Sequence, residues 1–158
     1  MGTDYSQRSG YDIVGRDGLT LTEKWAGGIR TLHGIHIHGF PNCFMMSIAQ
    51  SGFTVNFPYI IDLQARQIAY VVAAAQERGV ARLEATAEVE AAWVAAVIEK
   101  AGSTLEFSQS CTPGYYNNEG QPSVASRQNG FYMGAPTEFA ELLEAWRKDG
   151  ELRGLVLR

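Results

Sequence analysis

Three stretches of the chain repeat apolar residues at the spacing of an amphipathic helix. The longest, residues 58–78, starts on a proline, which suits the first turn of a helix, and follows Asn56, which is suited to cap it. Gly79 stands where a helix commonly ends. Residues 86–101 and 137–148 carry shorter apolar stripes of the same kind. The pattern therefore predicts three helices.

Strand patterns are shorter and less regular. Residues 29–37 alternate apolar and polar positions toward their end, which predicts a strand with two distinct faces. Residues 43–48 are almost continuously apolar, which is typical of a strand covered on both faces in a parallel sheet. Residues 152–158 alternate again and predict a terminal strand. We therefore expect an α/β fold with about three helices and three or four strands, and too few strands to be more than part of a larger α/β protein.

Length, charge and cysteine content narrow the class of protein. The chain has 158 residues and a formal net charge of -4, from 13 basic and 17 acidic residues. Because the basic residues are scattered, we expect no binding to nucleic acid or to an anionic membrane. No apolar run is long enough to span a membrane, and the first residues lack the apolar core of a signal peptide. We therefore expect a cytoplasmic protein in which Cys43 and Cys111 are reduced thiols.

Two histidines on one predicted strand are the main metal-ligand signal. His36 and His38 would share a strand face, at a spacing that zinc sites use, with His33 on the opposite face. No nearby Asp, Glu or Cys supplies a third ligand at a known spacing, so we expect no metal site. The Gly-x-Ser-x-Gly elbow of hydrolases is also missing. We therefore expect no nucleophilic catalysis involving these histidines.

Residues 50–56, with the sequence Gln-Ser-Gly-Phe-Thr-Val-Asn, are a candidate ligand cradle. Small residues let the backbone approach a ligand, and the start of the following helix offers unpaired N–H groups. A plain strand-to-helix connection has a similar composition. From these residues alone, both interpretations stay open.

A second candidate lies in the long non-periodic stretch of residues 103–130. Tyr115 and Tyr116 offer flat walls, and Asn117 and Asn118 can each donate and accept hydrogen bonds, which suits a pocket for a polar carbonyl compound. A solvated loop is the alternative interpretation. The Gly-x-Gly-x-x-Gly fingerprint is missing from the chain, so we expect no tight binding of FAD or NADP by this chain alone.

Several motifs together resemble one family, in the same order over essentially the whole chain. The most specific motif is Gly39-Phe40-Pro41-Asn42, which precedes a short apolar run. The others are Gly15-Arg16-Asp17-Gly18, Trp25 followed by Gly28, Ala91-Ala92-Trp93, the stretch from Cys111 to Gly120, and Phe131-Tyr132-Met133-Gly134. They are similar to the C-terminal region of class B flavoprotein monooxygenases, the Baeyer–Villiger enzymes. The stretch from Cys111 is similar to the subgroup acting on bulky ketones, steroids or large rings, although the tryptophan common in the last motif is missing here.

That resemblance implies the C-terminal fragment of a doubly wound FAD/NAD(P)-binding fold, in an FAD- and NADPH-dependent enzyme that inserts oxygen into ketones. Residues implied to lie beside the flavin ring are Ser51, Gly52, Phe53, Thr54, Asn56 and Phe57. Residues implied to shape the pocket for a small ketone or steroid-like substrate are Tyr115, Tyr116, Asn117 and Asn118. The family's catalytic arginine and nucleotide-binding motifs have no match in this chain, so we assign no catalytic residue.

The resemblance also implies an organisation within one segment, residues 1–158. We expect residues 1–56 to end the FAD-binding sheet, residues 57–102 to form a helical pair, and residues 103–158 to form a substrate-side loop with a C-terminal helix and strand. Such a segment would be inactive alone. The alternative is a truncated, non-catalytic module that self-associates through exposed apolar surface or completes a partner chain.

Overall fold

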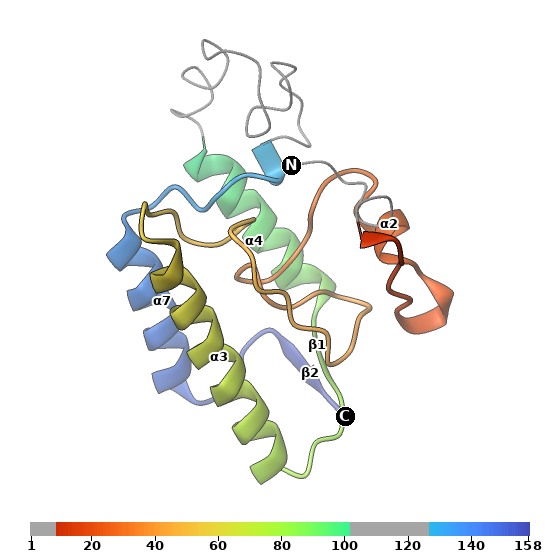
Figure 1. The fold of residues 1–158 in the computed structure, drawn as a ribbon. Coiled ribbons are helices and arrows are strands. Elements are labelled where there is room, and N and C mark those ends of the chain that lie inside the picture. The colour runs from red at the N-terminus through yellow and green to blue at the C-terminus, as the bar shows by residue number, and fades with distance from the viewer. Residues whose placement is uncertain (1–8, 102–126) are drawn as a thin grey trace.

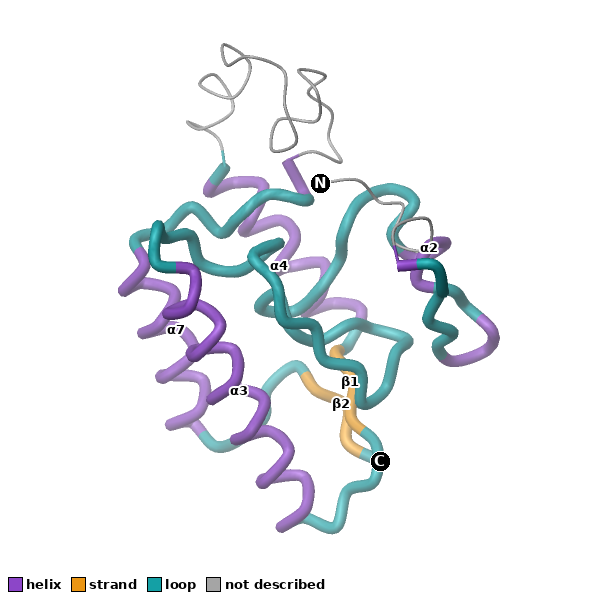
Figure 2. Tube along the Cα trace, in the orientation of Figure 1, coloured by secondary structure: helices purple, strands orange, loops and turns teal. Residues whose placement is uncertain are grey.

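The computed structural model of the protein describes residues 9–101 and 127–158. Figure 1 shows α3 and α7 side by side along one edge of the molecule, with α4 rising from a small two-stranded sheet. Loops and turns make up most of the chain before α3, as Figure 2 shows. The elements are η1 (Arg16–Gly18), α2 (Leu21–Lys24), α3 (Phe57–Glu77), β1 (Leu83–Ala85), α4 (Ala87–Lys100), α7 (Pro136–Asp149) and β2 (Leu155–Leu157).

All three predicted helices are confirmed. α3 begins one residue before Pro58, and Gly79 follows its end with a φ of 65°, a left-handed conformation that glycine adopts without strain. Thr86 caps α4 by accepting a hydrogen bond from the N–H of Val89 at 3.4 Å. α7 ends at Gly150, which has a φ of 75°. These start and end signals are local, which is why the sequence alone was enough to place the helices.

The strands differ from the prediction. β2 confirms the predicted terminal strand, and it pairs antiparallel with β1. The predicted strands at residues 29–37 and 43–48 were wrong, because the chain reverses at His33 (φ 57°) and Gly34 (φ 71°) and leaves only isolated bridges. The described residues therefore contain two short strands instead of three or four, while the predicted mixture of helices and strands is confirmed.

An aromatic core joins the three helices. Trp93 of α4 stacks on Tyr132 with 5.0 Å between ring centroids, and Phe139 of α7 lies 6.2 Å from the same indole. The other buried members of this core are Leu32, Ile60, Leu63, Ala85, Val97 and Leu143. Complete burial of a large apolar side chain contributes roughly 1.5–3 kcal/mol, so these contacts are the main apolar support of the helices.

Two buried glutamates hold the N-terminal loops against the remainder of the chain. Glu84 of β1 accepts a hydrogen bond from the backbone N–H of Gly39 at 2.7 Å. Glu90 of α4 accepts one from the ammonium of Lys24 at 2.7 Å and another from the backbone N–H of His38 at 2.9 Å. Side-chain carboxylates thus satisfy backbone donors that a regular sheet would otherwise pair.

The Gly39-Phe40-Pro41-Asn42 motif docks on β1 through its last residue. Asn42 has a φ of 57°, and its N–H donates to the carbonyl of Leu83 at 2.9 Å. The side chain of Asn42 accepts from the N–H of Leu83 at 3.1 Å and donates to the carbonyl of Ala81 at 2.9 Å. Asn42 therefore forms hydrogen bonds with the backbone at the start of β1 that a neighbouring strand would otherwise form.

His33 and His36 are both buried, which corrects the prediction that they lie on opposite faces of a half-exposed strand. Burial lowers the pKa of His33 to about 4. Burial, and then the neighbouring His33, lower the pKa of His36 to about 3. His38 is half-buried, and its Nδ1 lies 2.9 Å from the carbonyl of Ala85. Within residues 9–101 and 127–158, no group of three or more His, Cys, Asp or Glu residues could hold a metal ion.

Two further expectations concern the cysteine and the membrane. Cys43 is a free, half-buried thiol, and burial raises its pKa. Cys111 lies outside the described residues. Among the helices that the structure describes, none has the length and apolar character needed to cross a membrane.

Replacing Asn42 by alanine should destabilise the protein. The substitution removes two side-chain hydrogen bonds and places alanine at a positive φ, so we expect the free energy of unfolding to fall by about 2–3 kcal/mol. Urea denaturation measures the change. Asn56→Ala is the matched control, because the Asn56 side chain makes no capping bond, and its effect should stay below about 0.5 kcal/mol. Equal losses in the two variants would contradict the docking role of Asn42.

Acidification should destabilise the protein through the two buried histidines. The unfolded chain binds protons near the ordinary histidine pKa of 6.5, whereas the folded chain keeps both rings neutral down to about pH 4. Stability is therefore complete above pH 6.5 and is lost as pH falls toward 4, by up to about 1.4 kcal/mol per pH unit for each histidine.

Urea unfolding at a series of pH values between about 7.5 and about 4.5 checks this expectation. His33→Gln and His36→Gln should each reduce the slope of stability against pH, and His38→Gln is the control that should keep it. A free energy of unfolding that stays constant over this range would sink the idea that these rings are held neutral.

Candidate functional site

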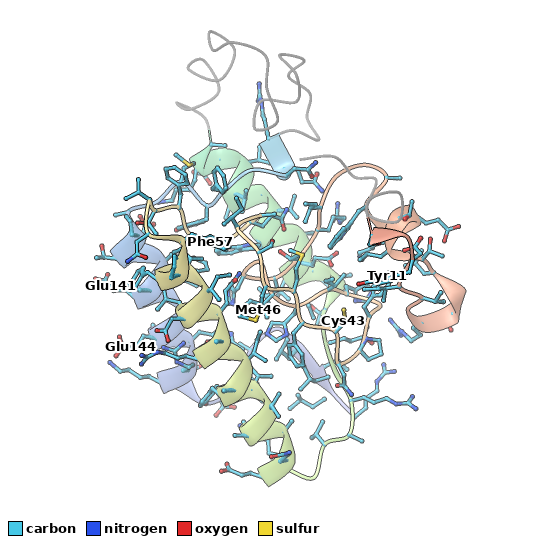
Figure 3. All side chains as sticks on the ribbon, viewed as in Figure 1. Tyr11, Cys43, Met46, Phe57, Glu141 and Glu144 are labelled. Atoms are coloured by element: carbon cyan, nitrogen blue, oxygen red, sulfur yellow. The ribbon has the colours of Figure 1, made fainter. Side chains whose placement is uncertain are left out.

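The predicted cradle borders a cavity at the start of α3. We name residues 50–57 the cradle loop. Figure 3 shows Phe57 at the N-terminal end of α3, with Met46 in the loop region alongside the helix. The cavity has a volume of about 620 Å³ and is lined by Ile48, Gly52, Phe53, Thr54, Phe57, Ile60 and Phe131. Among the described residues, the lining is apolar except for the Thr54 hydroxyl and the backbone, so this part of the site can hold a flat apolar group and contributes no acidic or basic side chain.

The side chain of Gln50 holds the base of the cradle loop. It is fully buried and donates to the carbonyl of Ile29 at 2.6 Å and to the carbonyl of Gln128 at 2.9 Å. Its oxygen accepts a hydrogen bond from the Thr31 hydroxyl at 2.6 Å. The amide thereby satisfies groups from two segments that lie far apart in the sequence.

The main chain of the same residue makes two further contacts. The N–H of Gln50 donates to the carbonyl of Gly130 at 2.7 Å, and its carbonyl accepts from the indole N–H of Trp93 at 3.0 Å. The next residue, Ser51, accepts from the N–H of Tyr132 at 2.9 Å. Residues 50 and 51 therefore fix the position of the segment that carries Phe131.

Gly52 is required by close packing inside the protein. A Cβ atom placed on it would lie 2.8 Å from the ring of Phe139, which is nearer than side chains tolerate. Gly52 also forms an isolated parallel bridge with Tyr132. The small residue lets the cradle loop lie directly on α7, which is a reason for glycine here that does not involve a ligand.

Aromatic rings form the rim of the cavity. Phe53 and Phe131 lie with 4.8 Å between ring centroids. Phe53 is 43% exposed and Phe57 is 45% exposed, and Val55 between them is fully exposed. Large apolar side chains at a concave surface indicate a site where another molecule or further polypeptide packs.

The start of α3 lies at the same cavity. Asn56 occupies the position before the helix, but its side chain makes no capping hydrogen bond. The hydroxyl of Thr54 accepts a hydrogen bond from the N–H of Asn56 at 3.2 Å. The first turn therefore presents the positive end of a 21-residue helix without a side-chain cap from Asn56.

An ion-paired cluster supports the residue that follows Phe131. The Tyr132 hydroxyl donates to Glu138 at 2.6 Å, and Lys100 pairs with the same carboxylate oxygen at 2.6 Å. Burial raises the pKa of Tyr132, and the hydrogen bond to Glu138 raises it further. A Cβ on Gly134 would lie 2.6 Å from the Glu138 carboxylate, which explains the glycine in this motif. The cluster fixes Tyr132 and lies outside the lining of the cavity.

The structure brings together four of the six residues predicted to lie beside a flavin: Gly52, Phe53, Thr54 and Phe57 all line the cavity. Ser51 is buried, with its hydroxyl donating to the carbonyl of Ser47 at 2.8 Å, and Asn56 is exposed. Their role toward a flavin stays a prediction.

Other predicted features lie outside the described residues. Tyr115, Tyr116, Asn117 and Asn118 fall within residues 102–126. The division of the chain at residues 56 and 102 also stays a prediction. Sequence reasoning missed Ile48 and Ile60 as cavity residues, and only Phe131 carried a signal, because it opens a motif shared with the resembled family.

Curated relatives match the chain over nearly all of its length. Pentalenolactone D synthase of Streptomyces exfoliatus is 48% identical over 154 residues, which is 98% of this chain and 26% of that protein. The FAD-binding monooxygenase hmp7 of Hypomyces subiculosus is 39% identical over 149 residues, which is 94% of this chain and 25% of that protein. No protein-family model matches the chain.

Solved structures agree with these relatives. The polycyclic ketone monooxygenase from the thermophilic fungus Thermothelomyces thermophila matches with a TM-score of 0.88 and 33% identity, over 98% of this chain and 25% of that one. An oxidized steroid monooxygenase bound to NADP matches with a TM-score of 0.75 and 27% identity, over 92% of this chain and 26% of that one. The predicted fold class, a fragment of an FAD/NAD(P)-binding fold, is confirmed. The predicted resemblance to the C-terminal region of Baeyer–Villiger monooxygenases is confirmed, and the chain spans about a quarter of the length of the curated relatives it matches.

Proposed function

We propose that this chain forms one wall of the flavin and ketone pocket of a Baeyer–Villiger monooxygenase whose other walls belong to further polypeptide. In the complete enzyme, one atom of O2 enters a ketone to give an ester or lactone. The other atom leaves as water, whose two hydrogens come from the hydride of NADPH and from one proton. The observation that carries this proposal is the rim of the cavity, where Phe53 and Phe57 border a concave surface and yet stay nearly half exposed.

The cavity fits one side of a flavin ring. FAD, when bound, supplies the oxygen-activating chemistry of this family. Gly52, Phe53 and Phe57 would offer the ring an apolar wall, with Thr54 adding a hydroxyl and Ser51 and Asn56 flanking them. The uncapped start of α3 would stabilise negative charge on the reduced ring, because the helix dipole places partial positive charge there.

The aromatic rim of the cavity also supports a proposal about the class of substrate. The phenyl rings of Phe53 and Phe131 favour a bulky, largely apolar ketone or a steroid-like compound over a small polar one. Tyr115, Tyr116, Asn117 and Asn118, which lie outside the described residues, stay our proposed substrate-binding residues. The absence of a dinucleotide fingerprint in the sequence indicates that the pyrophosphate of FAD, and NADP, are held by other polypeptide. We further propose a cytoplasmic location, where the thiol of Cys43 stays reduced.

The isolated 158-residue chain should neither retain FAD nor oxidise a ketone. One wall of a pocket buries too little of the cofactor to hold it, so we expect gel filtration after mixing with excess FAD to give colourless protein. NADPH consumption with a bulky ketone should equal the rate without protein.

A joined polypeptide provides the positive control. Fused behind the first three quarters of the Streptomyces exfoliatus relative, the chain should yield yellow protein and ketone-dependent NADPH oxidation. Stoichiometric flavin on the isolated chain, or ketone oxidation by it, would refute the idea of an incomplete pocket. A correctly folded fusion that binds FAD but oxidises no ketone would refute the assignment of the cavity.

A second candidate function is a non-catalytic module that self-associates or completes a partner. The exposed apolar side chains that favour it gather around the cradle loop: Met46, Phe53, Val55, Phe57 and Tyr59. Such side chains associate in water because contact removes apolar area from solvent.

Light scattering distinguishes the two candidates. If the rim drives association, the chain should form dimers or larger species, and the double variant Phe53→Ser with Val55→Ser should shift it toward the monomer. Val72→Ser is the matched control, since Val72 is 37% exposed on α3 and does not line the cavity. A chain that stays monomeric at high concentration would count against self-association.

A further inference from the structure

A second pocket lies on the open face of the small sheet, and it shares no lining residue with the cradle cavity. Its volume is about 300 Å³. Side chains two residues apart along an extended segment point to the same face. Glu84 of β1 and Arg82, which directly precedes β1, therefore share a face with their cross-strand neighbours Val156 and Arg158. All four line this pocket, and the sheet face is therefore its floor. The walls include Ile13, Arg16, Phe40 and Pro41.

Two arginines stand directly opposite each other on this floor. The N–H of Arg82 donates to the carbonyl of Arg158 at 2.7 Å, and the N–H of Arg158 donates to the carbonyl of Arg82 at 2.8 Å. Residues that exchange both backbone bonds have Cα atoms about 5.5 Å apart. Like charges directly opposite each other destabilise a sheet.

The one acidic side chain in the lining does not relieve that repulsion. Glu84 is buried and already accepts a hydrogen bond from Gly39, and it pairs with Arg16 at 3.4 Å. Within the part of the chain that the structure describes, the guanidinium groups of Arg82 and Arg158 have no hydrogen bond or ion pair. Over the described part of the lining, the side chains of three arginines and one glutamate carry an excess of two positive charges.

We propose that this pocket binds a small organic anion, a carboxylate or phosphate monoester with an apolar body. The planar forks of Arg82 and Arg158 match the oxygen atoms of such groups. Ile13, Phe40 and Pro41 provide apolar walls for the remainder of the ligand. A bound anion also converts the repulsion between the two arginines into attraction to a shared partner. The site shares no lining residue with the cradle cavity. A negative result in the anion-binding test would therefore not count against the proposed oxygenation reaction.

Thermal unfolding of the whole chain at pH 7 and constant ionic strength tests the proposal. Inorganic phosphate and hexanoate are titrated separately, with sodium chloride holding the ionic strength constant. The Tm should rise with a saturable dependence on at least one of them. In Arg82→Gln the half-saturating concentration should rise roughly tenfold or more, because a charge-assisted pair is lost. The Tm of that variant without anion should be equal to or above that of the original chain, because the repulsion is gone.

Arg66→Gln is the matched control, since Arg66 is exposed, pairs with Asp62 and lies outside the pocket lining. It should keep the anion response. If Arg82→Gln fails to fold, as judged by circular dichroism, Arg158→Gln takes its place. The ligand with the lower half-saturating concentration identifies carboxylate or phosphate as the favoured group. A Tm that rises without saturation, or equally in Arg82→Gln and the original chain, would overturn the proposal.

Discussion

The buried amide of Gln50 is the interaction on which the geometry of the cradle depends. Its side chain satisfies the carbonyls of Ile29 and Gln128, and its backbone binds Gly130 and Trp93. Leaving one such buried group unpaired costs about 1–3 kcal/mol, so the loop has a single well-defined position. That network also offsets the strain of a non-glycine residue at a φ of 56°. The part of the cradle loop that lines the cavity begins two residues later, at Gly52, so its position depends on Gln50.

Two kinds of support divide the molecule. The helices are held by apolar and aromatic packing around Trp93. The loops before α3 have a buried apolar cluster of their own, and polar side chains from β1 and α4 also bind them. The interior of the cradle is thus well satisfied, while its aromatic rim is left open to solvent. This contrast between a bonded base and an uncovered rim is the physical basis for placing a partner surface there rather than elsewhere.

The sequence predicted what local chemistry decides. The three helices follow from apolar periodicity and from residues such as Thr86 and Gly150, which act within one turn. The predicted strand at residues 29–37 failed because alternation looks the same in a strand and in a chain that reverses at His33. The sequence also predicted the cradle-loop residues that line the cavity, namely Gly52, Phe53, Thr54 and Phe57. It could not show that Phe131 packs on Phe53. The two residues are 78 positions apart (131 minus 53), and no local sequence pattern relates them.

Glu90 has a consequence for the order in which the chain acquires structure. Its partners Lys24, Arg30 and His38 precede it by 66, 60 and 52 residues. A ribosome releases the N-terminal loops first, well before the carboxylate that anchors them has been made. Closing such long loops yields no stabilising contact until both ends exist. The nascent N-terminal loops therefore lack these three contacts until α4 has emerged.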